Sequence, residues 1–327
     1  MATFNYPLVP RPIPVPRPWG GGRLCKLYDR ACVDSTQPIG ESWDVSTWPT
    51  DPGNPSLPTV TKITNGPLAG VPLDKVVDVP VVVKLLDSAE KLSVQVHPVE
   101  PDAHKDEMWY ILRADPDAYL YRGLAEGCNV EDFRELVKSP NPDEDEVLST
   151  LYCARHLKPG DHFNVPTGTI HAVGPGIIAF EVSEQTQITY RLFDYNRGRA
   201  LHLEEGCKAA STVRPNLLVL KPGLDIEGAE SIETITEFPT FCVVKATGGR
   251  FTVKSAAHMH LVTATMGDIK LSGPTPDWDI LLKHSYTCLA PPTFQPYTID
   301  TMGSGEVLIT PLKDPLKREF SSAGSYR

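Results

Sequence analysis

The sequence has no apolar run long enough to cross a membrane and no sign of a secretory leader. A membrane-spanning helix needs roughly 18 or more consecutive apolar residues, and no such run occurs among the 327 residues. The N-terminal letters M-A-T-F-N-Y-P-L-V-P-R-P do not combine a positively charged start with an apolar block, so no signal peptide is expected. We therefore expect a cytoplasmic protein that has no membrane partner.

Cysteine is scarce and follows no metal-binding or disulfide pattern. The seven cysteines are an odd number, and none of them forms a C-x-x-C pair. A scattered, odd set argues against both a disulfide framework and a cysteine-zinc knuckle. The expected state is reduced thiols in an intracellular protein.

Positive charge is also in deficit. The formal net charge is -10, which argues against a nucleic-acid partner. It does not argue against a small anionic ligand, because a few nearby Lys and Arg side chains outweigh charges that lie beyond the screening length.

Proline and glycine, in contrast, are abundant. The chain holds 32 Pro and 24 Gly, which suit many short strands joined by tight turns. Short β-type segments recur in both halves, so we expect a mainly β fold. Five of the prolines fall in residues 1–16, which predicts an extended arm on the surface.

One amphipathic helix stands out among the strands of the first half. Residues 130–138 carry an apolar stripe behind the N-cap candidate Asn129, and the acidic residues 139–146 after them are expected to be a solvated loop. A second group of short strands follows a polar link. We therefore predict two domains, an N-terminal domain at 1–210 and a C-terminal, structural domain at 211–327.

The stretch Lys91 to Tyr110 carries the strongest functional signal. It opens with strict alternation, which puts alternate residues on opposite faces of a strand. Pro98 ends this strand, and a second strand begins at Glu107. The polar face comprises Ser93, Gln95 and His97, and the apolar face comprises Leu92, Val94 and Val96.

Further polar side chains lie on later strands. Two turn signals predict a hairpin over residues 157–176, with His171 on its return strand. Glu181 and Arg191 each lie in the middle of an apolar strand pattern, so each points either to solvent or into a cavity where it needs a partner. Lys84 is a lone lysine in the apolar run 79–87, and such a lysine usually extends outward to solvent.

These residues are compatible with a metal site but do not establish one. Two histidines and a glutamate are suitable ligands for a borderline divalent metal such as zinc, and a Gln carbonyl is a possible fourth. However, no H-E-x-x-H motif occurs, and His97 and His171 meet only if the fold brings them together. A polar strand surface is the competing interpretation.

A set of motifs narrows these alternatives. Q-V-H-P, H-K-D-E-M-W-Y, V-P-T-G-T-I-H-A-V-G and T-Y-R-L-F-D-Y occur in this order, and W-G-G-G-R-L, G-E-S-W-D-V-S and N-G-P-L-A-G precede them. In combination they resemble the type I mannose-6-phosphate isomerases, most of all the short bacterial branch. The resemblance covers most of residues 17–200, and the C-terminal third is similar only in general character.

The resemblance implies a fold, a cofactor and a reaction. The fold is two cupin (jelly-roll) β-barrels with a small helical insertion in the first. The reaction is the reversible isomerisation of mannose 6-phosphate and fructose 6-phosphate through a cis-enediol, so the partner is a small-molecule sugar phosphate. The cofactor is one Zn²⁺ per chain, and the implied ligands are Gln95, His97, Glu107 and His171.

The same resemblance implies roles for other side chains. Arg191 is expected to be catalytic, Lys105 to take part in substrate binding or proton transfer, and Glu181 to be an active-site acid. Ser93 and Lys84 match positions linked with the phosphate end of the substrate. The chain departs from the family where Asp106 replaces a common proline, which predicts a less rigid loop.

Other readings remain open at this point. The protein could be an isomerase of different epimer preference, or one that acts on a free sugar, or a non-catalytic sugar-binding cupin. The H-M-H pair at residues 258–260 is a second possible metal motif, although a structural role is preferred. The sequence carries no signal of oligomeric state.

Overall fold

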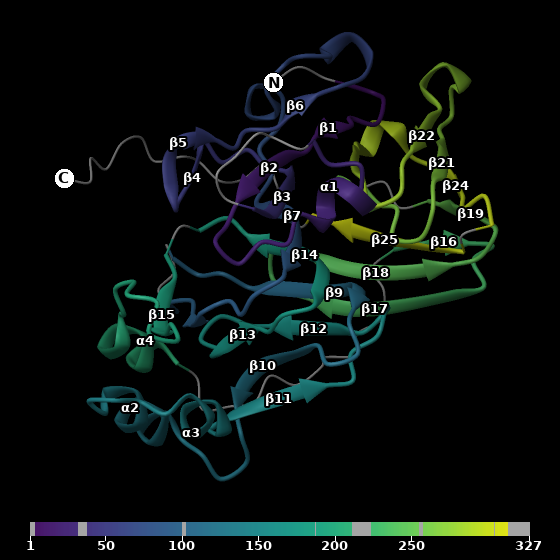
Figure 1. Ribbon diagram of the computed structural model, residues 1–327. Helices are drawn as coiled ribbons and strands as arrows, with labels where there is room; N and C mark the ends of the chain where they lie inside the picture. Colours follow the sequence, from purple (N-terminus) through teal and green to yellow (C-terminus); the bar gives the residue numbers. More distant parts are fainter. Residues whose placement is uncertain are drawn as a thin grey trace.

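The computed structural model describes most of the chain and is mainly β (Figure 1). The described residues are 4–31, 38–99, 103–186, 188–210, 224–254, 258–303 and 305–312. Among them, no helix has the length and apolar character needed to cross a membrane. The predicted class, two cupin-type barrels with a small helical part in the first, is confirmed.

The described residues of the first half of the chain form the strands β1–β15. Their bounds are β1 Pro10–Arg11, β2 Ile13–Pro16, β3 Ile39–Val45, β4 Thr50–Asp51, β5 Asn54–Pro58, β6 Lys62–Ile63, β7 Val81–Ser88, β8 Val94–Val96, β9 Glu107–Ala114, β10 Tyr119–Leu124, β11 Leu151–Arg155, β12 His162–Val165, β13 His171–Val173, β14 Ile177–Glu184 and β15 Tyr190–Phe193.

The remaining strands and the helices complete the described structure. The later strands are β16 Ile226–Glu227, β17 Ser231–Glu237, β18 Cys242–Thr247, β19 Arg250–Val253, β20 His260–Thr263, β21 Ile269–Ser272, β22 Ile280–Leu282, β23 Thr287–Ala290, β24 Tyr297–Asp300 and β25 Glu306–Pro311. The α-helices are α1 Arg23–Leu27, α2 Val130–Lys138, α3 Glu144–Ser149 and α4 Leu203–Ala209, and the 3₁₀ turns are η1 Gly66–Leu68, η2 Leu73–Lys75, η3 Pro276–Trp278 and η4 Pro292–Phe294.

Two antiparallel sheets form the first barrel. One has the order β12-β9-β14-β7-β3-β2 and the other β11-β10-β13-β8-β15. Apolar side chains from both sheets meet between them, for example Trp109 of β9 with Leu120 of β10. The polar cavity described below shares this interior, because period-2 alternation turns one face of every strand inward.

The second barrel is built in the same way and packs on the back of the first. Its sheets have the orders β16-β19-β24-β21-β22 and β17-β18-β25-β20-β23. One hydrophobic cluster joins the barrels, containing Met108 and Phe180 of the first with Leu261 and Leu308 of the second. The six-stranded sheet that carries Glu107 is therefore buried between its own barrel and the next (Figure 1).

Helices cover the outer face of the first barrel's five-stranded sheet, β11-β10-β13-β8-β15. The prediction of a helix over residues 130–138 is confirmed, and the Asn129 side chain accepts from two backbone N–H groups in a capping box. Phe133 of this helix packs in one cluster with Val94 and Val96 of β8. The apolar side chains Val94 and Val96 of β8 therefore lie under helices.

Three local predictions are wrong. The N-terminal arm is extended but not superficial, since Tyr6 and Leu8 are buried and β2 pairs with β3. Residues 157–176 are not a hairpin, because β12 pairs with β9 while β13 pairs with β10 and β8 in the other sheet. The acidic segment 139–146 is only partly a loop, since α3 begins within it, capped by Asp143.

The predicted domain boundary stays a prediction. It falls at residues 210 and 211, next to residues 211–223, which lie outside the described part of the chain.

Candidate active site

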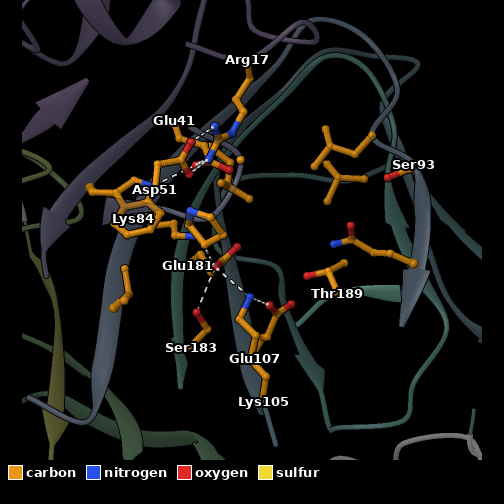
Figure 2. A pocket seen from close by; sticks show the side chains of 18 of the residues that line it. Arg17, Glu41, Asp51, Lys84, Ser93, Lys105, Glu107, Glu181, Ser183 and Thr189 are labelled. Carbon is orange, nitrogen blue, oxygen red and sulfur yellow. Dashed lines mark hydrogen bonds and ion pairs between the residues drawn. The ribbon is translucent and has the colours of Figure 1, made fainter. Parts of the chain in front are cut away.

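A cavity of about 580 Å³ opens inside the first barrel. Strands of both sheets line it, and its walls are rich in charge (Figure 2). All nine predicted site residues line it: Lys84, Ser93, Gln95, His97, Lys105, Glu107, His171, Glu181 and Arg191.

The four predicted metal ligands converge at one point of this cavity. His97, Glu107 and His171 are all buried, and their ligand atoms lie within 4.8 Å of one another. His97 Nε2 is 3.2 Å and His171 Nε2 is 3.7 Å from the Glu107 carboxylate. The β8–β13 register sets Gln95 opposite His171, with the Gln95 side-chain amide 3.2 Å from His171 Nε2.

Backbone carbonyls orient both imidazoles. His97 Nδ1 lies 3.1 Å from the carbonyl of Ile188, and His171 Nδ1 lies 2.8 Å from that of Thr169. A hydrogen on Nδ1 satisfies each carbonyl, which leaves the Nε2 lone pair of each ring turned toward Glu107. Ligating histidines are commonly held in this way.

The protonation states suit a cation. Burial lowers the pKa of His171 to about 4, so its imidazole is neutral at pH 7. Burial by itself would raise the pKa of Glu107, but the charge of Lys105 holds it well below its usual value. A neutral imidazole and an ionised carboxylate are the forms in which such groups ligate a metal.

The donor set therefore fits a divalent metal such as zinc. His97 Nε2 is buried and has no hydrogen-bond partner among the described residues, although it faces a carboxylate. The oxygen and nitrogen of the Gln95 amide are exchangeable by a flip of the group, which turns its carbonyl toward the same point. Nitrogen and oxygen donors in this number match a zinc site.

Two lysines and a second carboxylate lie beside the ligands. Glu181 Oε1 is 3.5 Å from Lys84 Nζ and 3.9 Å from Lys105 Nζ, and it accepts a hydrogen bond from Ser183. Lys105 also forms an ion pair with Glu107. Burial lowers the pKa of Lys105, but Glu107 and Glu181 more than offset this effect and the net shift is upward.

Lys84 does not extend outward as the sequence pattern suggested. Its side chain is only 13% exposed, and its Nζ lies 4.7 Å from the centre of the Trp43 ring. The β7–β3 register places Lys84 opposite Trp43 on the inward face. A lysine that faces a carboxylate and an aromatic ring has no need of solvent.

Arg191 reaches the cavity from β15, where it is paired with Gln95 of β8. Its guanidinium donates to the carbonyl of Ala200 at 2.8 Å, and no ion pair to a described carboxylate is found. Burial and the neighbouring Arg199 lower its pKa. A register shift follows Arg191, and Phe193 lies in the apolar cluster under the helices.

One wall of the cavity was not predicted. Arg17 forms ion pairs with Glu41 at 2.8 Å and Asp51 at 2.7 Å (Figure 2). Burial by itself would raise the pKa of Glu41. The charges of Arg17 and Lys84 have a larger, opposite effect, and the pKa falls to about 2. The sequence did contain a signal for Glu41, because it is a charged residue inside a strand pattern, as Glu181 is.

Histidines of the second barrel do not form a metal site within the described residues. His260 Nδ1 lies 2.9 Å from the hydroxyl of Tyr297. Both clusters of three potential ligands that the described part contains are in the first barrel.

Fold and site together define a two-barrel β protein with a candidate metal centre in its first barrel. No protein-family model matches the chain. Mannose-6-phosphate isomerase of Streptococcus mutans is 30% identical over 281 residues, which cover 78% of this chain and 83% of that protein. The chain belongs to the mannose-6-phosphate isomerase family.

Two further comparisons agree with this assignment. Mannose-6-phosphate isomerase ManA of Bacillus subtilis is 38% identical over 141 residues, covering 38% of this chain and 42% of that protein. The crystal structure of the mannose 6-phosphate isomerase from Bacillus subtilis superposes with a TM-score of 0.76 at 23% identity, covering 93% of this chain and 99% of that one. At this identity the superposition supports the fold alone.

Proposed function

We propose that the protein is a metal-dependent isomerase that interconverts mannose 6-phosphate and fructose 6-phosphate, with one zinc ion per chain. The observation that carries this proposal is the convergence in one cavity of the four predicted ligands, the Lys105–Glu181 pair and Arg191. Family membership supplies the substrate class. No disulfide joins the six cysteines among the described residues, which agrees with a reducing compartment, and we retain the cytoplasm as the proposed location.

The metal ligands proposed are Gln95, His97, Glu107 and His171. A divalent ion held there supplies Lewis acidity that polarises the sugar carbonyl or orients the adjacent hydroxyls. The chain contributes the geometry, because the carbonyls of Ile188 and Thr169 fix both imidazoles.

Proton movement between C1 and C2 is assigned to Lys105 and Glu181. Their charged atoms are 3.9 Å apart on the wall beside the ligands, and a carboxylate and an ammonium at this distance can accept and return a proton. Arg191 is assigned to the negative charge that develops on the enediolate oxygen, since a guanidinium stays cationic at any working pH.

The phosphate end of the substrate is assigned to Ser93 or Lys84. The two assignments predict different effects of substitution on KM. Figure 2 shows them on opposite sides of the cavity. Lys84 is already paired with Glu181, whereas Ser93 lines the opposite side of the cavity. If Ser93 receives the phosphate, Ser93→Ala raises KM more than Lys84→Met does.

The test is a substrate comparison on the purified protein, with His171→Ala as the control for contaminating isomerases. Mannose 6-phosphate should be converted to fructose 6-phosphate, with a kcat/KM at least about 100-fold above that for free mannose. Preference for glucose 6-phosphate would show a different epimer specificity. Binding without turnover of any of the three sugars would identify a non-catalytic protein.

A further inference from the structure

The segment that carries Lys105 joins β8 to β9 and is anchored on two sides. Lys105 N donates to the Thr167 hydroxyl at 2.9 Å, and Thr167 N donates to Asp106 Oδ1 at 2.9 Å. On the other side Asp106 N donates to the Glu184 carboxylate at 3.1 Å. The loop was expected to be less rigid at Asp106, but Asp106 ties it down through both its carboxylate and its backbone N–H.

Glu184 is the buried link between this segment and the second barrel. It ends β14 and is only 4% exposed. Its Oε2 receives Asp106 N and lies 2.6 Å from His104 Nδ1. Its Oε1 accepts the hydroxyl of Thr240 at 2.7 Å, and Thr240 belongs to the second barrel.

The position of Thr240 is itself fixed. It lies in the turn between β17 and β18, which is closed by a hydrogen bond from Phe238 N to the carbonyl of Phe241 at 2.8 Å. Phe241 is fully buried in the cluster that both barrels share, together with Met108 of β9. Close packing of such a cluster leaves little freedom for the turn.

A metal site is a less well supported interpretation of the same residues. His104, Asp106 and Glu184 form a group that could hold a cation. However, the two nitrogens of His104 each face a different carboxylate, at 2.6 Å to Glu184 and 3.7 Å to Asp106. The imidazole ring itself therefore fills the space between the carboxylates.

We propose that Thr240 is a positioning residue for the isomerisation. Through Glu184 it holds residues 104–106 against the end of β14, and so sets Lys105 Nζ relative to Glu107 and Glu181. The second barrel thereby has a role in turnover. This inference rests on the proposed function, because Lys105 is assigned there to proton transfer, and small displacements of a reacting group cost large factors in rate.

The test compares Thr240→Val, which removes the hydroxyl at nearly constant shape, with Thr240→Ser, which keeps it. Thr252→Val is the matched control, since the Thr252 hydroxyl meets Thr298 in the other sheet of the second barrel. Thr240→Val should lower kcat on mannose 6-phosphate at least about fivefold while KM and zinc content stay within twofold. Thr240→Ser and Thr252→Val should stay within twofold of the unmodified protein in kcat.

Hydrogen exchange of the peptide covering residues 103–110 gives a readout that does not depend on activity. Thr240→Val should exchange faster there, and Thr240→Ser should not. Unchanged exchange in Thr240→Val would overturn the link itself. Faster exchange with unchanged kcat, or a Thr240→Ser variant as impaired as Thr240→Val, would overturn the positioning role. An unmodified protein inactive on mannose 6-phosphate would instead contradict the proposed function, and exchange would still test the link.

Discussion

Arg191 differs from the other cationic side chains of the cavity in its surroundings. Arg17, Lys84 and Lys105 each face at least one carboxylate. The guanidinium of Arg191 is held instead by the carbonyl of Ala200, and its Nε is buried with no hydrogen-bond partner among the described residues. The guanidinium of Arg191 is therefore available to bind a negatively charged group of a substrate.

Replacement of Arg191 tests this role. Arg191→Ala should lower kcat about 100-fold or more, in the range found when a stabilising donor is removed from a developing oxyanion. Arg191→Lys should restore only part of the loss, because an ammonium lacks the planar fork of a guanidinium. Zinc content and the circular dichroism spectrum are the controls. Near-normal turnover in Arg191→Ala would remove Arg191 from the mechanism.

Sequence reasoning succeeded with residues that motifs identify and failed with those that only contacts identify. The family resemblance pointed to all nine predicted site residues, and all nine line the cavity, but it did not show that Lys84 faces Glu181 across a strand pair. Arg17, Glu41 and Asp51 were missed because their ion pairs join three separate segments. An alternating pattern gives the face of a residue but not its partner.

At the scale of elements, helices support the strand that carries two of the ligands. Phe133 and Val137 of α2 pack in one cluster with Val94 and Val96 of β8. The opposite face of β8 presents Gln95, and His97 follows directly after the strand. The helices therefore stabilise β8 by packing on its apolar face, and their side chains do not line the cavity.

Substitution of the N-cap residue of α2 tests whether this helix affects stability without affecting turnover. Asn129→Ala removes the acceptor for the N–H groups of Glu131 and Asp132 and should lower the free energy of unfolding by about 1 kcal/mol. Asn129→Ser, which keeps a cap, should cost less. Turnover per folded molecule should not change, and urea unfolding followed by an activity assay measures both. A parallel loss of kcat would mean that α2 reaches into the chemistry.

Local patterns predicted elements better than connections. The helix at 130–138 has the predicted bounds, because an amphipathic period is a local property of the sequence. The false hairpin at 157–176 arose because turn residues were read as joining neighbours in one sheet. In a barrel made of two sheets, a turn can also carry the chain across to the facing sheet.

At the scale of the whole molecule, a buried histidine of the second barrel is expected to make the stability of the protein sensitive to pH. Burial lowers the pKa of His260 from 6.5 to about 4, so the folded protein favours the neutral imidazole. Its contribution to stability is complete above pH 6.5 and is lost as the pH falls toward 4. The maximum effect is about 3 kcal/mol.

His260→Gln should remove this sensitivity, because an amide does not titrate. The free energy of unfolding of the unmodified protein should fall by roughly 2 kcal/mol more than that of the variant between pH 7 and pH 5. The exposed His156 provides a control, as His156→Gln should follow the unmodified protein. Equal pH dependence in all three proteins would show that His260 is not a source of acid sensitivity.

The ligands come together only when the first barrel closes, since Gln95 and His97 lie on or beside β8, Glu107 begins β9 and His171 begins β13. The most direct measurement is turnover of mannose 6-phosphate before and after removal of metal by a chelator. The account predicts that chelation abolishes turnover and that one equivalent of zinc per chain restores it. Full turnover by a protein from which elemental analysis shows the metal to be gone would contradict it.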